Sequence, residues 1–187
     1  MQEYNLNNMN RLEKKYREEV ISKMKDKFGY KSNMAVPRIS KVVLNVGISA
    51  TKNDDKYIDL VVNTLSRITG QKPVLTKAKE SISSFKIREG NVVGAAVVIR
   101  RFRMYDFIDK FINLTLPNVR DFRGLNQKSV DKHGNLSIGL REHLCFPEIN
   151  PDEVENIHGL EVCIVTSTND REQGLELLTL MGIPFAK

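Results

Sequence analysis

The side chains best suited to chemistry in this sequence are the cations gathered between residues 70 and 103. This stretch reads GQKPVLTKAKESISSFKIREGNVVGAAVVIRRFR, with eight lysines and arginines and only two acids, Glu80 and Glu89. Such a cluster is typical of a surface that binds the phosphates of a nucleic acid. A solvated hairpin beside a core strand would have the same composition, so the residues alone leave both interpretations open.

The two halves of this stretch predict different structures. Thr76 to Ser84 is small, polar and basic, and it has no apolar period that could bury a face. We therefore predict a mobile basic loop at about 76–84. Val92 to Ile99 is an apolar run of strand length that stops at Arg100 and Arg101, which predicts a buried strand ending in arginines.

The charge of the whole chain points to the same class of partner. The net charge is +6, but residues 142–186 hold nine acids and one base, so the first 141 residues carry +13. A polyanion is the first partner that this imbalance suggests. A basic protein without a special partner is the alternative.

Signatures of catalysis are missing from the sequence. His133, His143 and His158 lie in different segments without the spacing of metal ligands, and a lone histidine is more often structural or exposed. No phosphate-binding loop, nucleophile elbow, zinc-binding helix or dinucleotide fingerprint occurs. We predict no enzyme activity, no catalytic residue, no metal and no cofactor. Cys145 and Cys163 stand in apolar surroundings and are expected to be buried, reduced thiols.

The length and hydropathy of the chain bound its organisation. The 187 residues favour one domain, which we place at 10–187 behind a flexible N-terminal extension at 1–9. No long uncharged apolar segment and no apolar signal core is present, which predicts a cytoplasmic protein without a membrane partner.

Helices and strands alternate irregularly along the chain, which predicts an α+β fold. We expect an antiparallel sheet with helices packed mainly on one face and the other face free to bind RNA. Three of the expected helices begin near Asn10, near Asp54 or Asp55, and near Asn169 or Asp170, and another, the third along the chain, is indicated by Tyr105, Phe107, Ile108, Phe111 and Ile112. They end at Gly29, Gly70, before Pro117 and at Gly182. Besides 92–99, the expected strands are 38–46, 136–140 and 162–165.

Six strings in this chain closely resemble, in the same order, the bacterial form of large-subunit ribosomal protein five. They are VPRISKVVLNVG (36–47), TGQKPVLTKAKESISSFKIREG (69–90), RMYDFIDKF (103–111), LPNVRDFRGLN (116–126), GNLSIGLREHLCFPEI (134–149) and GLEVCIVT (159–166). The resemblance runs from about Asn10 to Phe185. It implies an antiparallel sheet backed by helices in a structural protein of the large ribosomal subunit, which attaches 5S rRNA to the central protuberance.

The resemblance also implies which residues bind. The 5S rRNA site would comprise Lys41, Asn45, Gln71 and Arg100, in which lysine and arginine neutralise phosphates while the two amides can pair with base edges or 2′-hydroxyls. A turn or bulge before Gly47 is the structural alternative for Asn45. Large-subunit rRNA and other 5S-associated ribosomal proteins would be further partners.

Two more partners follow from the resemblance. The basic loop would reach the peptidyl-site tRNA through Lys77, Lys79, Ser81, Ser83 and Ser84. Sequence-blind phosphate contacts suit a site that must accept every tRNA. The region 117–141 would form an intersubunit bridge with the small-subunit head protein thirteen through Arg120, Asp121, Arg123, Asp131 and Lys132. For Arg120 and Arg123, packing within their own loop is equally compatible with the sequence.

Some positions depart from the family pattern. Val98 stands where many relatives have threonine, Arg101 stands where glycine is common, and DKHGN at 131–135 replaces the more usual DGRGN. Two other functions compete with an RNA scaffold: a small RNA-acting enzyme that uses the same basic loop, and a free RNA-binding regulator. Turnover on RNA would reveal the enzyme, and cosedimentation with large subunits would argue against the regulator.

Overall fold

The structure is a computed structural model that describes residues 10–48, 55–154 and 156–186. The predicted N-terminal extension at 1–9 and a helix cap at Asp54 lie outside the described residues. Contacts group the chain into two compact units. Unit 1 comprises Met1–Val42, Arg100–Ser137 and Ile164–Lys187, and unit 2 comprises Val43–Ile99 and Ile138–Cys163. The single domain expected over 10–187 stays a prediction.

Five strands form one antiparallel sheet in the order β2-β3-β1-β5-β4, which confirms the α+β class. Their bounds are Ile39–Gly47 for β1, Val74–Lys77 for β2, Val92–Ile99 for β3, Leu136–Leu140 for β4 and Leu160–Thr166 for β5. β3 and β4 have the predicted bounds. The sequence does not predict β2, because all four of its residues are exposed and it lies at the edge of the sheet, so no side-chain alternation marks it.

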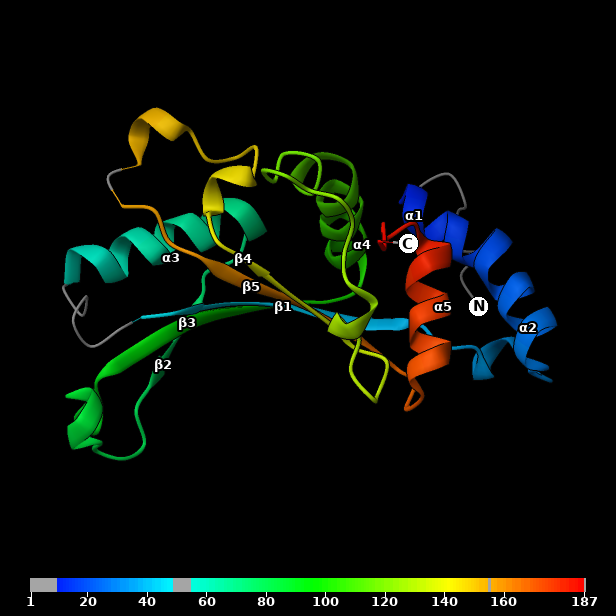
Figure 1. Ribbon diagram of the computed structural model, residues 1–187, viewed down its shortest axis with the longest axis horizontal. Coiled ribbons are helices and arrows are strands. Elements are labelled where there is room, and N and C mark those ends of the chain that lie inside the picture. The colour runs from blue at the N-terminus through cyan, green and yellow to red at the C-terminus, as the bar shows by residue number, and fades with distance from the viewer. Residues whose placement is uncertain (1–9, 49–54, 155, 187) are drawn as a thin grey trace, which may run out of the picture. The chain divides into compact units, whose positions relative to one another are not determined.

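In unit 2, helix α3 (Asp55–Thr69) covers strand β3 (Figure 1). The sequence predicts an apolar stripe on this helix, of which Ile58, Val61, Leu65 and Ile68 are buried and Val62 is half-buried. β3 buries Ala95, Val97 and Ile99. Since side chains alternate along a strand, the even-numbered residues of β3 lie on its opposite face.

In unit 1, the first helical segment contains a π-helical turn. α1 (Arg11–Lys15) continues through the π-helical turn Tyr16–Val20 into α2 (Ile21–Phe28). Its apolar residues recur every four positions, and in a pure α-helix such a stripe would drift by about 40° at each step. The wider π turn compensates for this drift, so that Leu12, Tyr16, Val20 and Met24 are all buried. Gly29 ends the helix in the left-handed conformation, as predicted (φ 70°).

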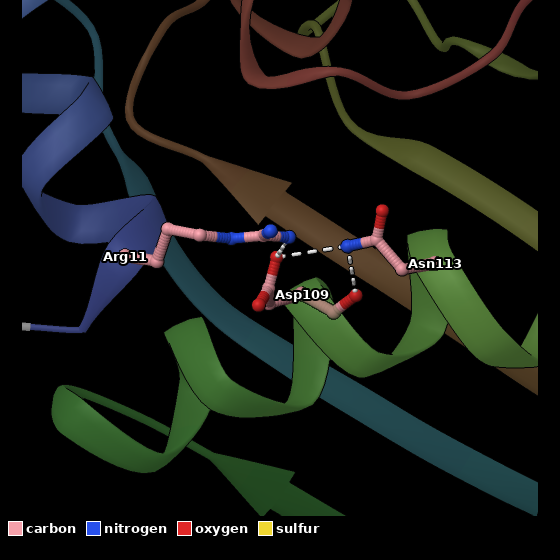
Figure 2. A network of polar contacts seen from close by, with 3 residues as sticks. All are labelled: Arg11, Asp109 and Asn113. Atoms are coloured by element: carbon pink, nitrogen blue, oxygen red, sulfur yellow. Dashed lines mark hydrogen bonds and ion pairs between the residues drawn. The ribbon is translucent and has the colours of Figure 1, made fainter.

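Helix α4 (Phe102–Lys110) also runs into a π-helical turn, Phe111–Thr115. A polar network ties it to α1, where Arg11 Nη2 donates to Asp109 Oδ1 at 2.7 Å and Asn113 Nδ2 donates to the same oxygen at 2.9 Å (Figure 2). Arg101, directly before α4, has a φ of 57°. This conformation favours glycine, so Arg101 occupies a backbone position that suits the residue common in the family.

Helix α5 (Arg171–Met181) closes unit 1 and contacts α2 (Figure 1). Asp170 caps it by accepting a hydrogen bond from the Glu172 N–H at 3.0 Å. The spacing of apolar residues in this helix predicts core contacts at Leu175, Leu178 and Met181. Leu178 and Met181 are buried, but Leu175 is only half-buried and Leu177 is buried in its place. Gly174 is buried as well, where the helix meets the turn at Gly134.

Candidate RNA and protein interface

The sheet-side candidates begin on β1, which has one apolar and one polar face. Val42, Leu44 and Val46 are at most 1% exposed, whereas Asn45 is exposed and Lys41 half-buried. Lys41 and Asn45 are four positions apart in the strand, so both side chains lie on the face opposite the core. β1 therefore presents an amine and an amide on its open face.

The other two sheet-side candidates lie just outside regular elements. Gln71 follows α3, and its main-chain N–H and C=O both hydrogen-bond the Thr69 hydroxyl at 3.2 Å, so the turn that carries its half-buried side chain is fixed. Arg100 is exposed directly after β3. Lys41 and Arg100 belong to unit 1, and Asn45 and Gln71 to unit 2. A patch shared by all four stays a prediction.

Residues 78–91 form an arm between β2 and β3 that projects beyond the ends of these strands (Figure 1). At its base, Ala78 N–H donates to Asn91 C=O at 2.8 Å and Gly90 N–H donates to Ala78 C=O at 3.0 Å. Further out, Ile82 and Ile87 exchange two main-chain hydrogen bonds. The arm thus has internal order within the segment that the sequence predicts to be mobile, and its mobility stays a prediction.

The candidate residues on this arm and at its base differ in whether their side chains take part in hydrogen bonds that shape the arm. Lys77 and Lys79 are exposed, as are Ser83 and Ser84 at the tip. Ser81 is also exposed, but its hydroxyl accepts a hydrogen bond from Glu89 N–H at 2.9 Å. Ser81 therefore helps to close the arm.

The candidates for protein contact lie in the loop 117–135 of unit 1. Arg120, Asp121, Arg123 and Lys132 are exposed. Asp121 adopts the left-handed conformation (φ 54°). It lines a hollow of about 660 Å³ whose other lining residues are apolar or glycine: Ile112, Pro117, Val119, Phe122, Gly182 and Pro184. This surface combines both signs of charge with a recess that an apolar side chain could enter.

Asp131 is exposed too, and its carboxylate organises its own turn. Its oxygens accept hydrogen bonds from His133 N–H at 2.9 Å, from Asn135 N–H at 2.7 Å and from Asn135 Nδ2 at 2.9 Å. Partial desolvation acts to raise the pKa of Asp131, but these hydrogen bonds outweigh it and hold the pKa below its usual value. Asp131 therefore shapes the loop, whether or not it also meets a partner.

The C-terminal segment fastens this loop in place. Arg171 at the start of α5 donates from Nε to Val130 C=O at 3.2 Å and from Nη2 to Gln127 C=O at 3.0 Å. Thr166 Oγ1 donates to Gly134 C=O at 3.1 Å, and Thr166 N–H donates to Asn135 Oδ1 at 3.0 Å. The sequence does not reveal this role of Arg171, since its acceptors are main-chain carbonyls that any residue would supply.

The histidines and cysteines are placed as structural groups. His143 and His158 are 0% and 5% exposed, and their rings stack with centroids 4.1 Å apart. Neither cysteine is part of a disulfide. Cys145 is buried as expected, and burial raises the pKa of its thiol to about 11, which makes it a poor nucleophile at neutral pH. Cys163 is only half-buried, less than expected.

Within residues 10–48, 55–154 and 156–186, no three histidine, cysteine or acidic side chains are arranged to hold a metal ion. None of the helices there combines the length and apolar content needed to cross a bilayer.

Comparison with known proteins supports the expectation drawn from the residues. The family described as "Ribosomal protein L5" matches residues 32–88, and the model of the C-terminus of the same ribosomal family matches residues 92–185. The chain is 54% identical over 177 residues to the large ribosomal subunit protein uL5 of Halothermothrix orenii, covering 95% of this chain and 99% of the relative. For the proteins of the same name from Carboxydothermus hydrogenoformans and Clostridium perfringens, identity is 50% and 48% over 179 residues, covering 96% of this chain and all of each relative.

A basic α+β chain with these matches is a ribosomal protein, a structural component that catalyses no reaction. More narrowly, the chain belongs to the ribosomal protein L5 family. This confirms the resemblance seen in the sequence and, because the family is a structural component, the expectation that the chain is not an enzyme. The curated relatives are large-subunit proteins, in agreement with the predicted place in cytoplasmic ribosomes.

Proposed function

We propose that this chain is a structural constituent of the large ribosomal subunit that binds 5S rRNA through the open face of its sheet. The observation that carries the proposal is the two-faced strand β1, which buries Val42, Leu44 and Val46 while it presents Lys41 and Asn45 on the other face. An amine on this face can neutralise a phosphate, and an amide can pair with a base edge or a 2′-hydroxyl. Gln71 and Arg100 are the further contacts that we assign to 5S rRNA.

We expect Asn45→Ala to weaken the affinity for 5S rRNA by roughly 1–2 kcal/mol, the cost of losing a hydrogen bond with a charged or buried partner. Filter binding of the full-length protein to 5S rRNA measures this effect. Asn63→Ala is the matched control, because it removes an exposed amide from α3 in the same unit. Equal affinity of both variants would remove Asn45 from the site.

The basic arm and the loop 117–135 have separate partners in this proposal. The arm contacts the backbone of peptidyl-site tRNA through Lys77 and Lys79, with the tip serines nearby. The loop meets the small-subunit head protein thirteen through Arg120, Asp121, Arg123, Asp131 and Lys132. Its mixed charges suit a weak, salt-sensitive contact that can re-form as the subunits rotate.

The double variant Lys77→Ala, Lys79→Ala should leave 5S rRNA binding intact and loosen peptidyl-site tRNA. The loss should be uniform across tRNA species, and the slope of affinity against salt should fall by about 2, one for each lost phosphate contact. Titrating tRNA onto ribosomes assembled with the variant measures both quantities. The control Lys14→Ala, Lys23→Ala removes the same charge from the helices α1 and α2. A parallel loss of 5S rRNA and tRNA affinity would contradict the division between sheet and arm.

A further inference from the structure

The tip of the basic arm exposes an aromatic ring that has no role in the function proposed above. Phe85 is 67% exposed, and among the described residues only one other phenylalanine, Phe102 at 53%, is more than half exposed. Its neighbours on the arm are polar or charged, and Ile82 is also 45% exposed. Phe85 therefore makes little contribution to a core.

The backbone holds this ring in a defined turn. Ser83–Phe85 form a 3₁₀ turn that closes with Lys86 N–H donating to Ser83 C=O at 3.1 Å. Lys86 itself lies in the left-handed region (φ 54°), which ends the turn. Ile82 and Ile87, which flank this turn and Lys86, exchange main-chain hydrogen bonds of 2.9 and 3.2 Å. A ring placed on a closed turn loses little further conformational entropy when it binds.

The charges around the ring indicate what kind of surface it meets. Lys79, Lys86 and Arg88 are exposed on the same arm, with Lys77 at its base. Exposed aromatic rings between cations are the arrangement with which proteins bind unpaired nucleotides, because bases stack on the ring while cations hold the phosphates. An apolar pocket on a protein would accept the ring but would not need the cations.

We infer that Phe85 is a stacking platform for an exposed nucleobase of the RNA that the arm approaches. This inference rests on the proposed contact of the arm with peptidyl-site tRNA and adds a second kind of contact to it. The lysines bind phosphate without regard to sequence, and the ring binds the face of a base, which all four bases share. Both contacts therefore accept any tRNA.

The absence of tryptophan from the chain allows a direct test. Ribosomes assembled with Phe85→Trp carry one tryptophan in this protein, and the purified full-length variant bound to 5S rRNA carries the only one in that complex. Adding deacylated tRNA to the 5S complex should quench this fluorescence, since stacking brings the base against the indole. In assembled ribosomes, Phe85→Ala should weaken peptidyl-site tRNA about tenfold, within the range for loss of one base–aromatic stack, and Phe85→Trp should retain the affinity.

Two matched variants make the outcome decisive. Phe85→Leu keeps an apolar side chain without the ring and should lose as much affinity as Phe85→Ala. Phe102→Ala removes the other exposed phenylalanine and should change nothing. Full affinity in Phe85→Leu would show an apolar pocket, as on a protein, and would overturn the inference. Unchanged affinity in Phe85→Ala would also overturn it, while loss in the Lys77, Lys79 double variant would leave the tRNA contact itself standing.

Because Phe85 is exposed, its replacement should leave the thermal midpoint unchanged, so lost affinity cannot be attributed to misfolding. The salt dependence separates the two contacts. Phe85→Ala should lower the tRNA affinity by the same factor at every salt concentration, since no counterion is released by a stacked ring. A loss that disappears at high salt would assign the effect to the neighbouring cations and refute stacking.

Discussion

Replacing Gly174 with alanine is expected to lower the free energy of unfolding by about 2 to 3 kcal/mol, the upper part of the range for overpacking a filled site. A Cβ at this position would lie 2.6 Å from the Gly134 carbonyl oxygen and still closer to the Gly134 Cα. Both neighbours are main-chain atoms, which cannot rotate away. Alanine favours a helix over glycine by up to about 1 kcal/mol, so a net loss would arise from the contact alone.

Gly139→Ala is the control for this change. A Cβ on Gly139 in β4 meets no atom within 4 Å, so the same substitution there should be neutral or slightly stabilising. Urea denaturation of both variants measures the difference in unfolding free energy. A Gly174→Ala protein as stable as the parent would mean that α5 and the turn at Gly134 can move apart without cost.

The strands that the sequence predicts best are those with a buried face. β3 and β4 are predicted residue for residue, because an apolar run or strict alternation shows where burial starts and ends. β2 carries no such mark. It is a strand because Val74 and Leu75 pair with Ala96 and Ala95 across the sheet, and this pairing depends on β3 rather than on the residues of β2.

The residues of the candidate site also differ in how far the sequence could predict them. Lys41 and Asn45 are expected in the site from the family resemblance, and their positions in β1 place them on one face of that strand. Their binding of RNA stays a prediction. The role of Arg171 could not be predicted, because it depends on carbonyls 41 and 44 residues earlier in the chain. The exposure of Phe85 could not be predicted either, because a single aromatic residue among polar and charged neighbours belongs to no periodic pattern that would show whether it is buried.

The second large effect is expected from Arg171→Met, which removes the side chain that fastens the loop 117–135 to α5. Two hydrogen bonds from a charged donor are lost, and since the side chain is exposed we expect a cost of about 2 kcal/mol in unfolding free energy. Locally, the turn that Arg171 holds should open, and the amide hydrogens of Ser129 and Val130, which bond to Asn126 and Gln127, should exchange faster.

If this loop is the surface for the small-subunit head protein thirteen, Arg171→Met should also weaken that contact while 5S rRNA binding stays unchanged. Lys27→Met is the control, because it breaks an exposed ion pair between α2 and Glu176 of the same helix α5, at 2.7 Å, and should cost less than about 1 kcal/mol. Hydrogen exchange and affinity for isolated protein thirteen report the two effects separately. Arg171 can affect this contact only through the two carbonyls that it hydrogen-bonds. Faster exchange with unchanged affinity for protein thirteen would therefore show that its binding does not depend on the position of this loop.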